Sequence, residues 1–164
     1  MVDKELIRFV AESEGVSQQK LASSVKAGKA VVVKNAKRDI APLGIGYGLR
    51  TKINVNLGTS PAKTDIAEEL EKVRVSVKYG ADTIMDLSTG SDIDKTRRAV
   101  LKECQVPVGT VPVYQSFKLE EHPETDIDTM LKVIEKHCND GVDFVTLHCG
   151  LTKAALPLIK KRMM

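Results

Sequence analysis

The chain has 164 residues, with a hydrophobic fraction of 42% and a charged fraction of 29%, so it can bury one sizeable core. The formal net charge of +3 comes from interspersed basic and acidic residues, and only 4% of residues are aromatic. A nucleic-acid surface would cluster basic side chains and offer rings for stacking, so none is expected. No stretch approaches the roughly 18 apolar residues of a membrane span, and Asp3 and Glu5 precede the first apolar run. We expect a single-domain cytoplasmic protein without a membrane or nucleic-acid partner.

The cysteines do not form a recognisable motif. Cys104, Cys138 and Cys149 are odd in number and widely separated, so neither a disulfide framework nor a Cys-x-x-Cys metal site is predicted. Cys104 and Cys138 are expected to be small apolar fillers, as free cysteines usually are. Cys149 follows His148 at a predicted strand end, which makes it a weak candidate for lining a site.

Residues 1–50 are predicted to form a helical N-terminal extension with a short strand and a glycine-rich loop. Apolar residues within 6–10 indicate a first helix, and Ser17 is expected to cap a second one. Residues 30–33 favour a short strand. The loop at 42–50 has glycine at alternate positions but lacks the strand-then-helix context of a dinucleotide fingerprint, so a flexible or tightly turned loop is expected.

Residues 51–164 are predicted to contain four β/α units. Strand-like and helical runs alternate, as is typical of βαβ units and a parallel sheet. The strands are expected at 53–57, 82–87, 108–113 and 143–148, and the helices at about 63–79, 91–104, 126–140 and 152–161.

A short internal repeat supports this architecture. The segment at 80–85 has the order Gly, small apolar residue, Asp and then a strand-like run, and the same order returns at 141–146. In both copies glycine suits the end of the preceding helix, and aspartate suits the turn before the strand.

The first predicted strand carries two amides on one face. Side chains alternate along a strand, so Asn54 and Asn56 share one face while Ile53, Val55 and Leu57 share the other. An unpartnered buried amide costs roughly 1–3 kcal/mol. The pair therefore either bonds neighbouring loops or lines a polar cavity, and both interpretations stay open.

The ends of the four strands supply the candidate ligand-binding residues. The carboxyl ends of parallel strands meet at one edge, where ligands bind in barrels and in open α/β sheets. Tyr114 offers a ring and a hydroxyl, or is half-buried core, and His148 offers a hydrogen bond, a proton or a metal ligand, or is structural. Met85 is most simply core. The candidates at this edge are Asn56, Met85, Tyr114 and His148.

Other polar residues near this edge have simpler explanations. Asp86 is either a general acid or base or a partner for loop amides, and the second is favoured because carboxylates near helix starts commonly cap them. Residues 88–92 either hold a phosphate or contain the N-cap of the next helix. His122 and His137 are expected to be exposed.

Four motifs in order resemble the phosphomethylpyrimidine synthase (ThiC) family of the thiamine pathway. The resemblance covers about residues 15–152. The motifs are NVNLGTS at 54–60, KYGADTIMDLSTG at 78–90, PVGTVPVYQ at 107–115 and VIEKHCNDGVDF at 133–144.

The resemblance implies a fold and a chemistry. It implies a (β/α)8 barrel of the TIM type, of which four β/α units would make a part. It also implies a radical lyase that uses S-adenosylmethionine and a 4Fe–4S cluster to convert aminoimidazole ribonucleotide to hydroxymethylpyrimidine phosphate. By motif position, the nucleotide-binding residues implied are Asn56, Met85, Tyr114 and His148.

The departures from the family pattern limit what is expected. The cluster-binding Cys-x-x-Cys-x-x-x-x-Cys motif and the zinc-ligating histidines have no counterpart in this sequence, and residues 34–39 replace an Asn-Ile-Asn-His segment. We therefore expect no catalytic residue, no metal ligand and no cofactor bound by this chain alone. The alternatives are a non-catalytic module for nucleotide binding or assembly and a relative of the anaerobic hydroxybenzimidazole synthase.

A half-barrel leaves sheet edges unpaired and apolar faces uncovered. We therefore expect the chain to pair with itself or with a complementary chain, or else to form an open, compensated sheet.

Overall fold

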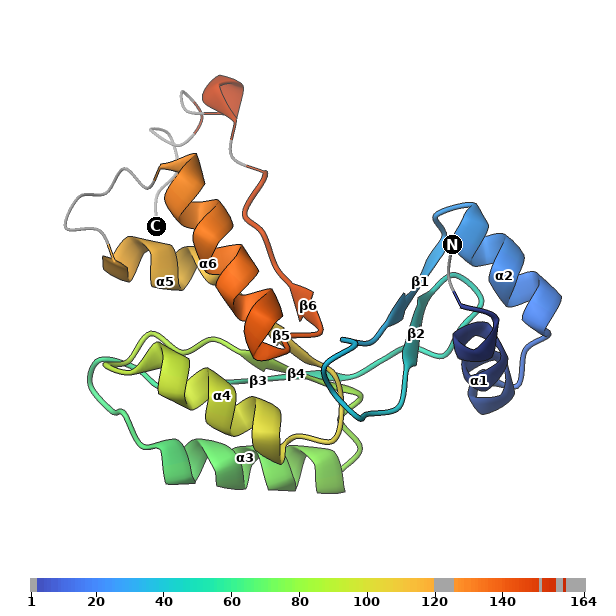
Figure 1. Cartoon of the computed structure of the whole chain (residues 1–164), viewed down its shortest axis with the longest axis horizontal. Helices are drawn as coiled ribbons and strands as arrows, with labels where there is room; N and C mark the ends of the chain where they lie inside the picture. Colours follow the sequence, from blue (N-terminus) through green and yellow to red (C-terminus); the bar gives the residue numbers. More distant parts are fainter. Residues whose placement is uncertain (1–2, 120–125, 151, 156–157, 159–164) are drawn as a thin grey trace.

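The computed structural model describes residues 3–119, 126–150, 152–155 and 158. Its strands form a two-stranded antiparallel sheet, β1–β2, and a four-stranded parallel sheet in the order β3-β4-β5-β6 (Figure 1). The prediction of an α/β fold with a parallel sheet is confirmed. In the part of the chain that the structure describes, no helix is long and apolar enough to cross a membrane.

Residues 3–50, which we call the N-terminal group, begin with two capped helices. Helix α1 spans Lys4–Glu14, and helix α2 spans Gln18–Lys26. The Ser17 hydroxyl accepts the Lys20 backbone N–H at 3.2 Å, so the predicted cap is confirmed. Strand β1 (Ala30–Val33) follows α2.

The predicted glycine-rich loop is wrong in part, because it contains strand β2 (Leu43–Gly46), which pairs antiparallel with β1. The glycines allow close packing. A Cβ on Gly44 would lie 2.4 Å from a Val10 side-chain carbon, and a Cβ on Gly46 would lie 2.4 Å from the Lys29 carbonyl oxygen. The alternate glycines therefore reflect a strand packed against α1 and its partner strand.

The parallel sheet follows the predicted order with shorter strands. The strands are β3 (Asn54–Leu57), β4 (Thr83–Asp86), β5 (Val108–Thr110) and β6 (Phe144–Val145). Their register places one residue from each strand in a single row across the sheet, and these residues are Asn56, Met85, Gly109 and Phe144.

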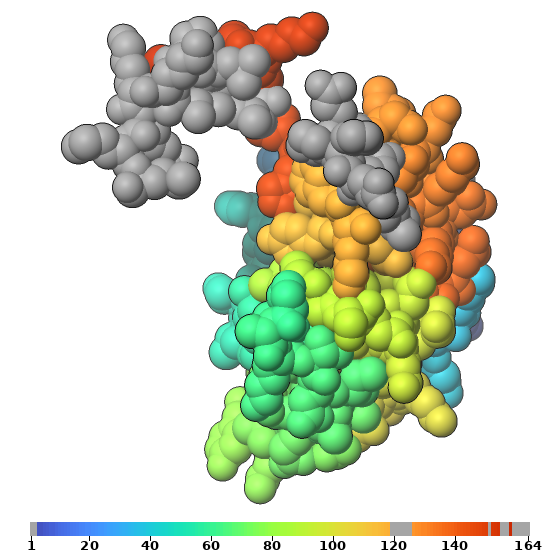
Figure 2. Space-filling model, turned by 90° about the vertical axis from the view of Figure 1, so that its left-hand side faces the viewer, coloured from blue at the N-terminus to red at the C-terminus, as the bar shows by residue number. Residues whose placement is uncertain are grey.

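Three predicted helices are present with small shifts of their ends. They are α3 (Ile66–Lys78), α4 (Ile93–Glu103) and α6 (Ile127–Asp140). Each begins after an aspartate whose carboxylate accepts a backbone N–H of the first turn, as N-caps do. Figure 2 shows α3, α4 and the α5–α6 pair as successive bands of surface, from green to orange.

Two predicted elements differ from the structure. The strand expected at 108–113 ends at Thr110, and Pro112–Leu119 forms helix α5. Proline suits the first helical position because its fixed φ is already helical and its missing N–H has no helical partner there. Of the helix expected at 152–161, the structure describes a 3-10 turn, η1 (Lys153–Ala155), and residue 158, while 156–157 and 159–161 lie outside the described residues.

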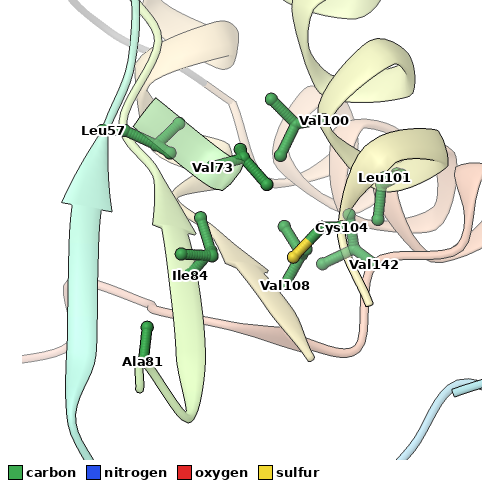
Figure 3. Close-up of a cluster of buried hydrophobic side chains, with 9 residues drawn as sticks. All are labelled: Leu57, Val73, Ala81, Ile84, Val100, Leu101, Cys104, Val108 and Val142. Carbon is green, nitrogen blue, oxygen red and sulfur yellow. The ribbon is translucent and has the colours of Figure 1, made fainter. Parts of the chain in front are cut away.

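The main core lies between one face of the parallel sheet and the helices. Figure 3 shows nine buried side chains, which come from the strands and the segments before them, from α3 and from α4 with its C-cap: Leu57, Val73, Ala81, Ile84, Val100, Leu101, Cys104, Val108 and Val142. Cys104 is a core filler as predicted, and burial raises the pKa of its thiol. The same prediction for Cys138 is wrong, because Cys138 is exposed on α6.

Two aspartates join the N-terminal group to the amino ends of the parallel strands. Asp82 precedes β4 and pairs with Arg50, and Asp143 precedes β6 and pairs with Arg38. Each carboxylate also accepts the backbone N–H at the start of a neighbouring strand segment. Asp82 accepts from Ile53 at 2.7 Å, and Asp143 accepts from Val108 at 2.8 Å. The internal repeat thus places two equivalent aspartates in equivalent roles.

The Arg38–Asp143 ion pair is the more buried of the two. Its guanidinium donates to the carbonyl oxygens of Leu101 at 3.1 Å and Val106 at 3.2 Å, and also to that of Cys104. A cation at the end of α4 satisfies carbonyls that have no helical partner and suits the helix dipole. Residues 34–39, which depart from the family pattern, therefore attach the N-terminal group to the sheet.

Candidate functional site

The four predicted site residues lie at the carboxyl end of the parallel sheet, where the structure brings them together as two pairs. Asn56 on β3 is in register with Met85 on β4. Tyr114 lies in the first turn of α5, and its ring centroid is 6.1 Å from that of His148, which follows β6. Tyr114 was expected at a strand end; it reaches this edge from a helix because β5 stops early.

The two asparagines bond to each other across one face of β3. Asn54 Nδ2 donates to Asn56 Oδ1 at 2.9 Å, and Asn54 Oδ1 accepts from Thr83 Oγ1 at 2.8 Å. Both amides are exposed. In the described part of the chain, Asn56 thus engages its oxygen with a neighbour and keeps its NH2 group without a protein acceptor. This face of the sheet is therefore polar and open at β3.

Phe144 lies on the same open face, and sequence reasoning missed it. A Cβ on Gly109 would lie 2.3 Å from the Phe144 ring, so the ring lies over the glycine of the neighbouring strand. The glycine in β5 was a signal of close approach, but only the register identifies the partner. The row of Asn56, Met85, Gly109 and Phe144 sets an amide beside an apolar thioether and a ring, an arrangement that suits a flat, polar heterocycle.

Asp86 is a hydrogen-bond partner of the loop that follows β4, as favoured from the sequence. Its buried carboxylate accepts the Ser88 backbone N–H at 2.9 Å and the Ser88 hydroxyl at 2.5 Å. Burial raises the pKa of Asp86, and the bonds from Ser88 oppose that rise. Ser88 Oγ in turn accepts the Thr59 N–H at 3.1 Å, which links the loops after β3 and β4. Of the alternatives for residues 88–92, the structure shows Asp92 as the N-cap of α4.

A buried polar network lies beside this edge, between α4, α5 and α6. Arg97 is fully buried and donates to Asp140 at 2.6 Å and to Asp94 at 2.6 Å. His137, predicted to be exposed, is 2% exposed; its position four residues after Val133 on the buried face of α6 was the signal. Burial, and then the Arg97 charge, lower the pKa of His137 to about 4. The other histidine of that prediction, at position 122, lies outside the described residues.

A structural metal site needs several ligating side chains close together. Among them, no group of three or more His, Cys, Asp or Glu side chains is placed to hold a metal ion. Cys104 is buried in the core, whereas Cys138 and Cys149 are exposed on α6 and on the segment after β6. These residues do not fit a 4Fe–4S cluster or a zinc ion.

Comparison with known proteins decides the family. The chain matches the model of the radical SAM ThiC family over residues 2–164. It belongs to this family. Phosphomethylpyrimidine synthase of Thermodesulfovibrio yellowstonii is 50% identical over 161 residues, which are 95% of this chain and 38% of the relative.

Two further relatives agree with this assignment to the ThiC family. Phosphomethylpyrimidine synthase of Methanopyrus kandleri is 48% identical over 163 residues, and that of Methanocaldococcus jannaschii is 44% identical over 162 residues. The match covers 95% and 96% of this chain, respectively, and 38% of each relative. The resemblance inferred from the four motifs is confirmed, and the chain spans about two fifths of the length of these ThiC relatives.

Proposed function

We propose that this chain supplies part of the nucleotide-binding surface of a phosphomethylpyrimidine synthase, the enzyme name that its curated relatives carry. The ligand proposed is aminoimidazole ribonucleotide, which such a synthase converts to hydroxymethylpyrimidine phosphate in thiamine biosynthesis. The observation that supports this is the pairing of Asn56 with Met85 at the same sheet edge as the Tyr114–His148 pair.

Each residue has a role that its chemistry allows. The open NH2 group of Asn56 donates a hydrogen bond to the nucleotide, and the thioether of Met85 packs against its ring. The Tyr114 hydroxyl and the His148 imidazole exchange hydrogen bonds with its polar groups. All four act in binding and orientation, and no catalytic residue is assigned to this chain.

In this proposal, the cofactor chemistry takes place in the full-length relatives. Membership of a radical SAM family implies S-adenosylmethionine and an iron–sulfur cluster for the full-length enzymes. The described residues of this chain do not fit the cluster, so no step is assigned to it here. A cytoplasmic location stays a prediction.

The half-barrel is the structural part of the proposal. Among the described strands, β3 pairs only with β4 and β6 only with β5, so each has one open edge. The exposed side of α6 carries Ile127 and Leu131, which are 76% and 56% exposed. Further β/α units of a (β/α)8 barrel would pair with these edges and cover this helix face.

Without such units the chain is expected to associate with itself. Light scattering at micromolar concentration measures this directly. A mass above that of one 17.9 kDa chain is expected, and a stable monomer with no partner present would contradict the proposed open edges.

A second candidate function is a non-catalytic module that binds the nucleotide or assists assembly. It is favoured by one observation: Asn56 and Met85 lie side by side at the carboxyl end of the sheet, whereas the described residues hold no group of three or more side chains that could bind a metal ion. Anaerobic reconstitution with iron and sulfide tests a premise that both candidates share. An iron–sulfur absorbance and EPR signal on this chain would contradict both of them, because neither assigns a cluster to this chain.

Calorimetry with aminoimidazole ribonucleotide tests the binding proposal. Saturable binding is expected for the wild-type chain, and Asn56→Ala should weaken it about tenfold, which corresponds to about 1.4 kcal/mol. Asn139→Ala is the matched control, because Asn139 is an exposed amide on α6, at the end of the helix that leads into β6. An absence of binding, or equal affinity in wild type and Asn56→Ala, would overturn the proposal.

A further inference from the structure

Gln115 is buried and follows Tyr114 directly in helix α5. The residue is 5% exposed, and its side chain is the one from α5 that enters the polar network of Arg97 and His137. Two further polar side chains of this helix make contacts. The Ser116 hydroxyl lies 3.2 Å from the Pro112 carbonyl oxygen within α5 and 3.4 Å from the Met130 sulfur on α6, and Lys118 donates to the Gly90 carbonyl oxygen.

The three contacts of the Gln115 amide reach two other helices. Its oxygen accepts from Arg97 Nη1 on α4 at 2.8 Å and lies 2.8 Å from His137 Nε2 on α6. Its NH2 group donates to Asp94 Oδ1, also on α4, at 2.8 Å. One amide therefore ties the first turn of α5 to both neighbouring helices.

The network around Gln115 is itself firmly held. Arg97 also bonds Asp140 on α6, and the other ring nitrogen of His137 lies 2.8 Å from Thr110 Oγ1 on β5. Lys136 pairs with Asp94 at the surface. A cavity of only about 10 Å³ adjoins the network, which is room for no more than one water molecule. A satisfied buried network of this kind makes its elements rigid.

Helix α5 needs such an anchor. It has 8 residues, and an isolated helix of that length is marginal in water. Consecutive residues of a helix point about 100° apart, so Gln115 can enter the network while Tyr114 faces the ring of His148. The orientation of the first turn therefore fixes where the Tyr114 ring lies.

We propose that Gln115 is a positioning residue, which holds Tyr114 against His148 at the ligand edge through its bonds to Arg97, His137 and Asp94. The ligand part of this inference rests on the proposed function, whereas the positional part does not. Gln115→Met keeps the length of the side chain and removes its hydrogen bonds, so the first turn of α5 should lose its fixed orientation.

The ligand-free test uses the ring signals of the three tyrosines in an aromatic ¹H–¹³C NMR spectrum. In Gln115→Met the Tyr114 signal should shift or broaden, while those of Tyr47 and Tyr79 stay unchanged. Gln105→Met, at an exposed glutamine, should move none of them. Gln115→Asn, which keeps an amide but shortens its reach, should give a smaller change in the same signal if Gln115→Met does not fold. An unchanged Tyr114 signal in the folded variant would overturn the inference.

A double-mutant cycle tests whether Gln115 acts through Tyr114. Calorimetry with aminoimidazole ribonucleotide should show about tenfold weaker binding for Gln115→Met than for wild type. In a Tyr114→Ala background the same change should cost no further affinity. Equal losses in both backgrounds would show that Gln115 acts elsewhere and would overturn the inference. If the wild-type chain does not bind the nucleotide, the proposed function fails, and the tyrosine spectrum alone still decides the role of Gln115.

Discussion

The two ends of the parallel sheet differ in how their polar side chains are used. At the amino ends, Asp82 and Asp143 are paired with arginines and accept backbone N–H groups. At the carboxyl ends, Asn56 and His148 are exposed, and Tyr114 is half-buried beside His148. One end therefore uses its polar groups to hold the chain together, while the other leaves them available.

The difference separates stability from binding within one sheet. Changes at the amino ends should alter the free energy of unfolding and leave ligand affinity nearly unchanged, whereas changes at the carboxyl ends should do the reverse. The same division is general in β/α folds, whose ligands bind at the carboxyl ends of the strands.

The largest loss in the free energy of unfolding is expected from a change at Asp143. The side chains of Arg38 and Asp143 are 8% and 0% exposed, so Asp143→Asn leaves a buried guanidinium without its counter-charge. Removing one partner of a buried ion pair costs about 3–5 kcal/mol. Chemical denaturation followed by circular dichroism measures this loss. Nucleotide affinity, measured where the variant is folded, should stay within about twofold of wild type.

The matched control is the repeat-equivalent change Asp82→Asn. Its partner Arg50 is 60% exposed, and an exposed ion pair contributes at most about 1 kcal/mol. Equal losses of unfolding free energy in the two variants would show that burial does not set the strength of the two ion pairs.

His137 is expected to make stability depend on pH. Its pKa is about 4 in the folded chain, because of burial and then Arg97, and about 6.5 when unfolded. Between these values the unfolded chain binds the extra proton, so stability should be constant above pH 6.5 and fall by up to about 3 kcal/mol toward pH 4. The surrounding charges are Arg97, Asp140, Asp94 and Lys136.

The pH range in which His137 affects stability is separate from the range in which the paired carboxylates do. Burial alone would raise the pKa of Asp94, but bonds from Lys136, Gln115 and Arg97 lower it, so its contribution is lost only under more acid conditions. The free energy of unfolding should therefore fall more steeply between pH 7 and pH 4.5 in wild type and in His148→Gln than in His137→Gln, which keeps only the contribution of other groups such as the buried Asp86. Equal slopes in wild type and His137→Gln would contradict this assignment.

A smaller effect is expected from Gly109→Ala, which touches the open face itself. The new Cβ would lie 2.3 Å from the Phe144 ring, so the ring must move, and such overpacking costs about 1–3 kcal/mol. Nucleotide affinity should fall as well, because the row through Asn56 and Met85 is disturbed. Gly150→Ala, with no atom within 4 Å of its Cβ, is the control for both measurements. Unchanged affinity in Gly109→Ala would place the ligand away from this row.

The alternation of strands and helices was predictable from the sequence. Periodicity and the repeat at 80–85 and 141–146 identified the parallel sheet, and the carboxyl-end rule identified the edge where Asn56 and Met85 lie side by side. These signals are local, so they can be read without knowing the tertiary structure.

What could not be predicted depends on contacts between distant segments. Val111 and Val113 look strand-like, but Pro112 starts a helix that α6 and the Gln115 network hold in place. His137 is buried because Arg97, forty positions earlier, meets it from α4. The glycines of β2 needed α1 and β1 as neighbours before their close packing could be recognised.

The most direct measurement is a ¹H–¹⁵N NMR titration of the chain with aminoimidazole ribonucleotide. Amide signals at the carboxyl ends, including those of Asn56, Met85 and Tyr114, should shift with a common affinity. Those at the amino ends, including Asp82 and Asp143, should stay in place. Shifts centred on the amino ends, or no shifts at saturating nucleotide, would contradict the assignment of ligand binding to the open end of this sheet.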